Sequence, residues 1–367
     1  MKTPLCVALV LTCLVPSILI AAETSDLIDL VQAIGHKGDG HPRAVKAARE
    51  LAQAPSGDAL EILAAIDNAN PLAANWLAGA FQSVADRGVK SGDLKANDLK
   101  NFLGETSHAA MARTLAFEYL TKVDSDSGEQ LIPQMLNDPA PALRRKGVAY
   151  HIDLAKKAEG DAALKQWKRA LDGAIDEDHV EEIAKALKDA GEEIDTREHF
   201  GLIREWHVIG PFDNRDQKGF PVAYPPEKQV DLDAQYEGMK GEVTWELLSS
   251  DEDDGAFDLA KLTEPHKGAI DYAYTEFQSP DDLDVQFRLA TPNAWKLWVN
   301  GQEVFAREEY HRGMRFDQYI VPGELKKGKN TILLKVCQNE QEQDWAQRWA
   351  FQFRIVDPSG RAVHEAK

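Results

Sequence analysis

The stretch AWKLWVNGQEVF, residues 294–305, predicts a β-hairpin and raises the question of what that hairpin presents. Two apolar runs meet at Asn300-Gly301. This pair is the strongest short sequence signal for a hairpin, because a type I′ turn needs positive φ at both central residues. We therefore expect one strand to end at Val299 and a second strand, containing EVF, to leave the turn.

The two tryptophans of this stretch lie on opposite faces of the expected strand. Trp295, Leu297 and Val299 alternate with Lys296 and Trp298, so one set faces the core and the other faces outward or toward a second sheet. Because Lys296 shares its side with Trp298, we expect Trp298 to be partly exposed and count it as a candidate ligand contact.

Around the hairpin, residues 200–367 consist of short β-rich runs that Gly, Pro, Asn and Asp separate. This pattern predicts a jelly roll or another β-sandwich, with Trp206 and Trp245 in the core. The runs are LIREWHVIG, VTWELL, AIDYAYTEF, LDVQFRLA, AWKLWVNG, FDQYIV, NTILLKVC and WAFQFRIVD.

The order of these runs resembles the galactose-binding-like jelly roll, which is found beside the catalytic domains of family 2 glycoside hydrolases and in many carbohydrate-binding modules. Val299-Asn300-Gly301 matches the strand end of that family's pattern, and the stretch from Leu325 to Val336 matches the turn and strand that follow. The resemblance implies the fold and leaves the activity open, because one fold hosts many functions.

Residues 23–195 differ in composition and periodicity: they are rich in Ala and Leu at helical spacing. Helix starts recur after similar punctuation near residues 41, 70, 107 and 138, and this recurrence predicts stacked helical pairs. Proline is expected in the first turn of such helices, where its missing N–H would be unpaired anyway. An irregular helical bundle is the alternative.

The stretch LNDPAPALRRKGVAYHIDLA, residues 136–155, resembles the second half of a HEAT-type repeat, in which Asp-Pro caps a helix and an arginine follows one turn later. Arg144 and Arg145 are expected off the buried face of this helix. Four apolar residues are expected on that face: Leu143, Val148, Ile152 and Ala155. Arrays of this kind serve as scaffolds or docking surfaces.

A resemblance also covers the whole second half. It is carried by WHVIGPFDN, YPPE, DLDAQY and VCQNEQEQDWAQRWAFQFRIVD. These segments resemble an uncharacterised family of exported bacterial proteins, in which helical repeats precede this sandwich. The resemblance implies the architecture, an α-helical repeat domain followed by a β-sandwich, and implies no activity.

The first residues, 1–22, have the layout of a secretory signal peptide: a basic residue, an apolar run and small residues at its end. A retained membrane anchor is the alternative. Cleavage would give an exported protein, periplasmic or extracellular, with no membrane attachment. Cys337 would then be the single cysteine, so no internal disulfide is expected, and its apolar surroundings predict a buried structural thiol.

The charge balance is acidic, with 42 Lys+Arg against 61 Asp+Glu and a net charge of −19. Nucleic acids and anionic membrane surfaces attract basic patches. The composition therefore argues against both as partners.

The polar loop of residues 308–313 is the leading candidate site. In sandwich modules of this type, loops at one end or one concave face bind sugars, with aromatic rings against C–H faces and polar groups for hydroxyls. With Trp298, the candidate contacts are Tyr310, His311, Arg312, Asp317, Trp345 and Arg348. The alternative is a loop pinned by an arginine–carboxylate network, with the tryptophans in the core.

Metal and cofactor signals are weak. The acidic run of residues 249–258 fails the EF-hand pattern, because Ser250 and Lys261 fall where Asp and Glu are required. A structural calcium is common in sandwich modules of the resembled fold, but its ligands are unassigned here. No cofactor is expected, and no nucleophile, phosphate-binding or metalloprotease motif occurs in the sequence.

These observations predict an exported, non-catalytic binding protein. Its β-sandwich would recognise a carbohydrate or glycoconjugate, and its helical repeats would act as a scaffold. The first alternative is a protein–protein interaction module without a sugar ligand, with a protein partner docked on the helical repeats. The second is a hydrolase of unrecognised type. Glycoside hydrolysis needs two carboxylates across a cleft, and a chain with 61 acidic residues always offers such a pair, so no pair is singled out.

Overall fold

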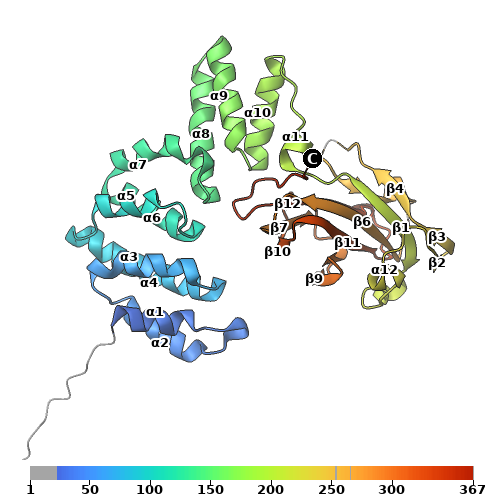
Figure 1. Ribbon diagram of the computed structural model, residues 1–367, viewed down its shortest axis with the longest axis horizontal. Helices are drawn as coiled ribbons and strands as arrows, with labels where there is room; N and C mark the ends of the chain where they lie inside the picture. Colours follow the sequence, from blue (N-terminus) through green and yellow to red (C-terminus); the bar gives the residue numbers. More distant parts are fainter. Residues whose placement is uncertain (1–22, 253, 265, 367) are drawn as a thin grey trace, which may run out of the picture. The chain divides into compact units, whose positions relative to one another are not determined.

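The computed structural model describes residues 23–252, 254–264 and 266–366. The expected signal peptide at 1–22 lies outside these residues. Helices come first along the chain and antiparallel strands follow (Figure 1), as the sequence predicts. The chain divides into two compact units, residues up to 129 and residues 130–367, and each is described by itself.

The first unit consists of helices that pack in consecutive pairs. α1 packs on α2, α3 on α4 and α5 on α6, while α4 also contacts α2 and α6. Successive pairs therefore stack through α4. The helices are α1 (Thr24–Gln32), α2 (His41–Leu51), α3 (Ala59–Ala64), α4 (Pro71–Ser91), α5 (Ala96–Gly104) and α6 (Ala110–Val123), and α7 (Ser125–Leu131) crosses into the second unit.

Capping explains where the longest of these helices begins. The Asn70 side chain accepts hydrogen bonds from the amides of Leu72 and Ala73, at 3.0 and 3.1 Å, and Pro71 occupies the first helical position. Together they satisfy two of the free N–H groups at the helix start and preset its φ. Proline also lies in the first turns of α2 and α8, which confirms that expectation.

The second unit opens with four helices: α8 (Pro141–Lys157), α9 (Gly160–Gly173), α10 (Glu177–Asp189) and α11 (Thr196–Phe200). The predicted apolar face of α8 is buried. It joins a cluster that also contains Phe200, Leu202 and Phe316. The change from helix to strand falls near the expected boundary at 195–200, but the compact unit that holds the strands begins at residue 130, because this cluster links helices to strand-side residues.

Arg144 corrects a prediction about α8. It was expected off the buried face, yet it is buried while Arg145 is exposed. Its Nε donates to the carbonyl of Asp138 at 2.9 Å, and its Nη2 donates to the hydroxyl of Ser359 at 3.0 Å. The turn after the last strand, which contains Ser359, lies against this side of α8. No local pattern in the α8 sequence predicts that this turn buries Arg144.

The strands form two main antiparallel sheets. One has the order β4-β1-β6-β11-β8-β9 and the other β10-β7-β12-β5. A separate hairpin pairs β2 (Gln235–Gly238) with β3 (Gly241–Thr244), and two short helices, α12 (Pro225–Lys228) and α13 (Leu259–Leu262), lie in the connections. The sheet strands are β1 (Glu205–Asp213), β4 (Glu246–Ser249), β5 (Phe257–Asp258), β6 (Ala269–Ser279), β7 (Leu283–Ala290), β8 (Ala294–Val299), β9 (Gln302–Arg307), β10 (Tyr319–Leu325), β11 (Gly328–Gln338) and β12 (Ala350–Val356).

The predicted hairpin is present between β8 and β9. Asn300 has φ 50° and Gly301 has φ 77°, as a turn with two positive φ values requires. The Asn300 side chain donates to the side-chain oxygen of Asn330 at 2.9 Å and accepts from the amide of Thr331 at 2.9 Å. The two motifs that carry the jelly-roll resemblance therefore hold each other in register.

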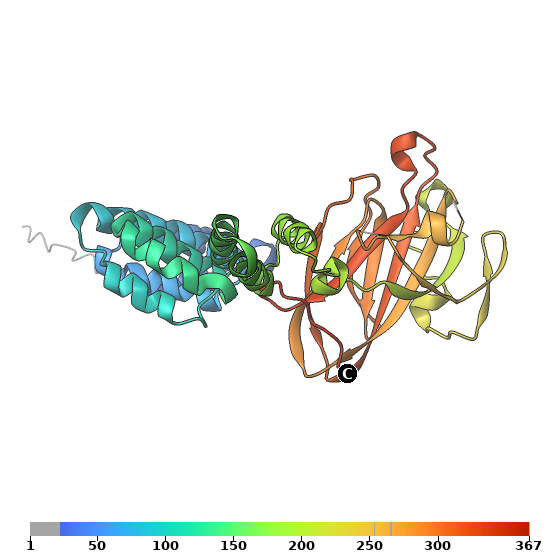
Figure 2. The same cartoon turned by 90° about the horizontal axis from the view of Figure 1, so that it is seen from above.

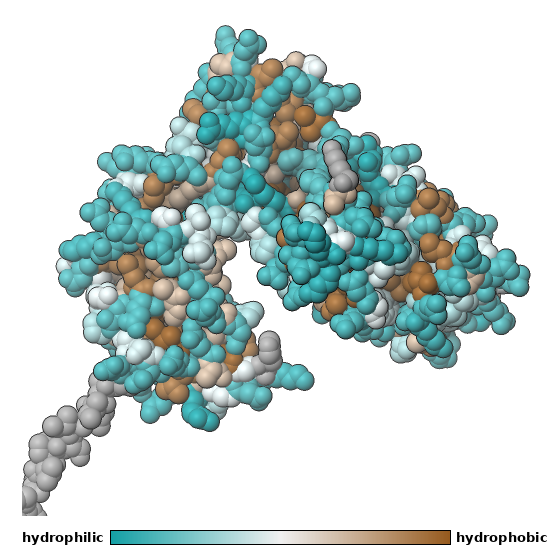
Figure 3. All heavy atoms as spheres, in the orientation of Figure 1, coloured by the Kyte–Doolittle hydropathy of each residue, from teal (hydrophilic) through white to brown (hydrophobic). Residues whose placement is uncertain are grey.

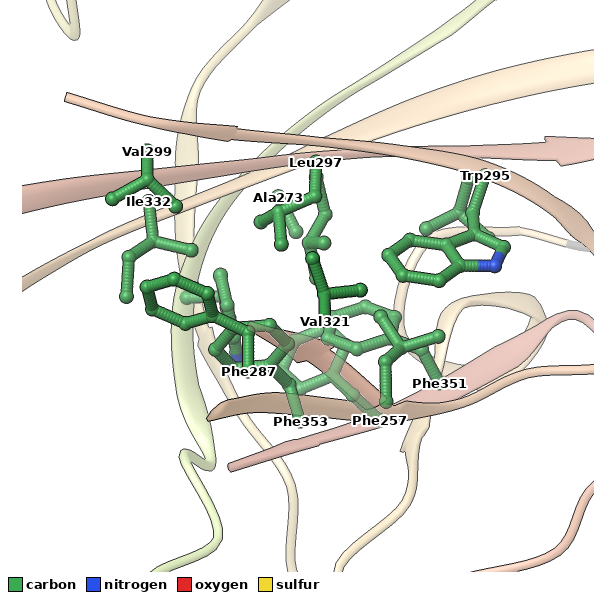
Figure 4. Close-up of a cluster of buried hydrophobic side chains, with 14 of the residues drawn as sticks. Phe257, Ala273, Phe287, Trp295, Leu297, Val299, Val321, Ile332, Phe351 and Phe353 are labelled. Carbon is green, nitrogen blue, oxygen red and sulfur yellow. The ribbon is translucent and has the colours of Figure 1, made fainter. Parts of the chain in front are cut away.

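The space between the two sheets is the main core (Figure 4). Trp295 and Leu297 from β8 point toward Phe287 from β7 and Phe353 from β12. Burial of each such side chain is worth about 1.5–3 kcal/mol, so this core dominates the stability of the strand region. Trp206 lies in this core, and Trp245 is buried in a second cluster, as expected.

Candidate functional site

Tyr310 fastens the polar loop to a buried amide. Its hydroxyl accepts a hydrogen bond from Asn214 Nδ2 at 3.1 Å, and the same Nδ2 reaches the carbonyl of Gln338 at 3.0 Å. Asn214 is fully buried, and the Tyr310 ring packs against the second cluster. Burial raises the pKa of Tyr310 above its ordinary value. Tyr310 therefore holds the loop in place more than it faces solvent.

His311 links this loop to the connection that follows β11. Its backbone adopts φ 59°, and its Nε2 lies 2.8 Å from the side-chain oxygen of Asn339, which is buried. Its ring meets the ring of Trp345 edge-on, with centroids 5.0 Å apart and planes at 87°. Two of the predicted candidate contacts, from segments more than 30 residues apart, thus meet.

Trp345 is the most exposed large apolar side chain of the described residues, at 62%. It lies in a short turn, Asp344–Ala346, at the tip of a connection that projects from the strands in Figure 2. The last residue of the turn anchors it: Ala346 is buried, and its backbone carbonyl accepts a hydrogen bond from Lys267 Nζ at 2.9 Å. An exposed indole on a fixed turn can stack on a flat apolar surface of a ligand.

Arg312 is exposed and forms an ion pair with Glu309, with Nη2 3.2 Å from Oε1. Arg307 reaches the same oxygen at 2.8 Å. These two arginines hold the pKa of Glu309 below its ordinary value through hydrogen bonds. Because its side chain is 62% exposed, Arg312 remains accessible to a ligand.

Arg348 lines a hollow of about 550 Å³. Its Nη2 lies 3.3 Å from Asp254 Oδ2, and Gln352 donates to the Asp254 backbone carbonyl. The other lining residues are Glu252, Ala256, Asp258, Ala260, Lys261 and Gln347. Sequence reasoning selected Arg348 and considered the run of residues 249–258, which contains Asp254, as a calcium loop alone.

Asp317 is not a surface contact. Its carboxylate accepts from Arg288 Nη1 at 2.5 Å and from Arg354 Nε and Nη2 at 2.8 and 2.6 Å. Burial alone would raise the pKa of Asp317, but the hydrogen bonds and charges of Arg354 and Arg288 outweigh it and hold that pKa below the ordinary value. The candidate ligand contact is thus the centre of an arginine–carboxylate network.

Trp298 is also removed from the candidate surface. It was expected to be partly exposed, but it is only 6% exposed, in the second cluster on the outer face of the six-stranded sheet. Phe220 and Val243, from the 211–245 segment, share this cluster and cover the face. Lys296 lies over the rings of Phe220 and Trp298, at 5.0 and 5.8 Å. The sheet face that could take a flat ligand is filled by the chain itself.

Lys335, in strand β11, holds the covering 211–245 segment against the outer face of the six-stranded sheet. It is fully buried, and its Nζ donates to the carbonyls of Gly219, Phe220 and Val222 at 2.8–3.0 Å and to Glu227 Oε1 at 2.8 Å. Burial lowers the pKa of Lys335, and the bond to Glu227 offsets this in part. A lysine in the apolar run TILLKV was the only hint in the sequence, and it did not reveal the partner segment.

No group of three or more His, Cys, Asp or Glu side chains suited to a metal ion occurs among residues 23–252, 254–264 and 266–366. No helix in those ranges combines the length and apolar character that a membrane span needs. Cys337 is a free, buried thiol, and burial raises its pKa to about 12.

Comparisons with known proteins add little. No family model and no curated protein matches the sequence. Two solved structures of a β-glucosidase from Kluyveromyces marxianus, one labelled with selenomethionine and one in complex with glucose, align with TM-scores of 0.27 and 0.28 at 10% identity, over 81% of this chain and 38% of that chain. A GH31 α-xylosidase from Xanthomonas citri aligns with a TM-score of 0.17 at 9% identity, over 42% and 16%.

The chain therefore spans well under half the length of these neighbours. Overlaps of this quality carry no argument about fold or function. The candidate site is judged from its own geometry.

Proposed function

We propose that this chain is an exported, non-catalytic protein that binds a carbohydrate or glycoconjugate through the loops around Trp345. The strand region would be a galactose-binding-like jelly roll, and the helices up to residue 195 would be a HEAT-like scaffold. The single observation that carries the proposal is the 62% exposure of Trp345 on a turn whose Ala346 carbonyl accepts a hydrogen bond from the buried Gln338 side chain.

The surroundings of Trp345 suit a sugar. An indole face stacks on the C–H face of a pyranose, and hydroxyls need paired donors and acceptors close by. Gln347 and Arg348, two and three residues after Trp345, line the hollow with the carboxylate of Asp254. The His311 ring lies beside Trp345 in a T-shaped contact and adds a polar ring to this surface.

The proposal also explains why the sheet face is not the binding surface. The outer face of the six-stranded sheet is filled by Phe220, Val243 and Trp245, and Lys335 ties that cover down with four hydrogen bonds. Any ligand contact in this part of the molecule therefore falls to the loops.

A glycan array probed with residues 23–367 tests the function. We expect binding to a defined set of glycans without turnover of any of them. Trp345→Ala should abolish that binding, while Trp345→Phe, which keeps an aromatic face, should retain part of it. The proposal fails if no glycan binds, if Trp345→Ala binds as well as the parent protein, or if bound glycans are hydrolysed.

A further inference from the structure

The edge strand β4 leaves one side of the six-stranded sheet open. It pairs with β1 on one side and ends the sheet on the other, and Figure 1 shows it at the rim. The Ser250 amide donates to the carbonyl of Arg204 at 3.0 Å. Backbone groups alternate in direction along an antiparallel strand, so the amides and carbonyls of Leu247 and Ser249 point away from β1.

In the described parts of the chain, no hydrogen bond joins these outward backbone groups to another segment. An edge of this kind is a template on which an extended chain can add as a further strand. Leu247 is 56% exposed beside it, and it offers the apolar contact that an added strand would cover.

Three adjoining hollows border this edge. The first, of about 580 Å³, and the second, of about 410 Å³, share the residues Ser249, Ser250 and Asp251. The third, of about 320 Å³, shares Leu262 with the second and reaches Glu246 and Leu248. These three hollows, which together contact Glu246, Leu248 and Ser249 of β4, are called the trough.

The trough is acidic. Among its described lining residues, lysine and arginine occur only as Arg204, Lys240 and Lys261, and Lys261 is already paired with Glu252 at 2.7 Å. Carboxylates occur in all three hollows: Glu205 and Asp251 in the first, Glu252 and Asp258 in the second, Glu242 and Glu246 in the third. This lining favours a cationic occupant and opposes an anionic one.

We propose that β4 binds an extended, lysine- or arginine-rich polypeptide segment as an additional strand of the six-stranded sheet. The backbone of Leu247 and Ser249 supplies the pairing, Leu247 the apolar contact, and the carboxylates of the trough the preference for basic side chains. The pairing groups of Leu247 and Ser249 lie outside the hollow that Arg348 lines, although that hollow shares Glu252, Asp258 and Lys261 with the second one. The peptide proposal does not depend on a glycan.

The test uses residues 23–367 and a fluorescein-labelled peptide, Ac-KVKVKVK-NH2, followed by fluorescence anisotropy at fixed ionic strength. The control peptides are the same sequence with alternate amides N-methylated, and Ac-EVEVEVE-NH2. Loss of the pairing donors should weaken binding by about tenfold or more, and the acidic peptide should not bind. If the N-methylated peptide binds within about twofold of the parent, charge attraction alone explains the binding and the proposal is wrong.

Two variants of the protein locate the site. Leu247→Pro removes an outward N–H, and a proline at that position keeps the pairing with β1, so peptide binding should fall while the thermal melt stays. Glu246→Lys should weaken binding, while Glu324→Lys on the exposed edge strand β10 should not. Equal effects of the two lysine variants would overturn the proposal. If Leu247→Pro does not fold, the N-methylated peptide on the parent protein still decides.

Discussion

The two ends of the loop of residues 308–317 carry similar side chains and lie in opposite surroundings. At the first end, the Arg312 side chain is 62% exposed and pairs with Glu309 in solvent. At the second end, Asp317 accepts from Arg354, whose side chain is only 2% exposed, and from Arg288. The elements that face each end make the difference, because β7 and β12 bring an arginine each to Asp317.

The first end is an exposed surface. The second end is a structural joint, formed by Phe316 and Asp317 with Phe200, Arg288 and Arg354. At the second end, Phe316 packs on Phe200 with ring centroids 4.6 Å apart, and Arg354 lies 4.6 Å over the Phe316 ring and donates to the Phe200 carbonyl. The second end therefore ties the strands to the last helices. The first end is held by Tyr310 and His311 and leaves its charges to solvent, where a ligand can meet them.

The largest expected effect comes from removing the helices that the joint contacts. A fragment of residues 130–367 should melt cooperatively, because it keeps the cluster of Phe200, Leu202 and Phe316 whole. A fragment of residues 200–367 should retain a β-type circular dichroism spectrum but melt at a lower temperature. Equal melting temperatures would show that the joint contributes nothing to the strand region.

Asp317→Ala tests the joint with a single side chain. It leaves two mostly buried guanidinium groups without their carboxylate, and such a loss costs about 3–5 kcal/mol. Glu309→Ala is the matched control at the exposed end, and its effect on the free energy of unfolding should be small. Urea denaturation of both variants measures the contrast, and similar losses would remove the distinction between the two ends.

The same carboxylate gives a pH test of the joint. The folded-state pKa of Asp317 lies below its ordinary value, so its contribution to stability is present above the unfolded pKa of about 3.9. That contribution is lost as the pH falls through the folded value. The difference in unfolding free energy between the parent protein and Asp317→Asn should therefore shrink below about pH 4. A difference that stays constant down to the lowest accessible pH would contradict the pairing.

What the sequence could predict follows the same division. Local rules predicted the Asn300-Gly301 turn and the proline in the first turn of α4. They missed the burial of Trp298 and Arg144, because distant segments cover both residues. The composition of the loop predicted charged side chains around Asp317. It did not show that β7 and β12 would place Arg288 and Arg354 around this carboxylate.

Hydropathy gives no better guide to the site. Figure 3 shows hydrophilic residues over most of the visible surface, with small hydrophobic patches among them. Exposed apolar side chains such as Leu247 and Ile320 occur on edge strands as well as in loops. The exposure of Trp345 carries weight because buried polar groups hold its turn in place.

A smaller effect is expected at the hairpin that leads into the loop. Gly301→Val places a β-branched side chain at φ 77°, and a residue forced into this region costs on the order of 1–3 kcal/mol. Gly301→Asn, which tolerates positive φ, is the control and should lose less. Thermal melts of the two variants decide, and equal losses would mean that the turn does not depend on the backbone conformation of residue 301.

The smallest expected effect on stability is at the exposed end, and it is the most informative about function. Trp345 is 62% exposed, so Trp345→Ala should change the free energy of unfolding by no more than about 0.5 kcal/mol. Its proposed role is an aromatic face for a sugar, so the same substitution should remove glycan binding. Arg312→Ala should likewise keep the fold and weaken binding, because the Arg312 side chain is 62% exposed and Arg307 still pairs with Glu309.

His311→Ala tests whether the residues at this end hold the Trp345 turn in place or contact the glycan directly. It removes the edge-on ring and the bond to Asn339, so it should weaken glycan binding by loosening the turn, with a modest loss of stability. Measuring melting temperature and glycan affinity on the same purified variants decides between the two readings of the loop. If Trp345→Ala and Arg312→Ala lower the melting temperature as much as Asp317→Ala does, both ends of the loop serve to stabilise the fold, and the proposed sugar contact is wrong.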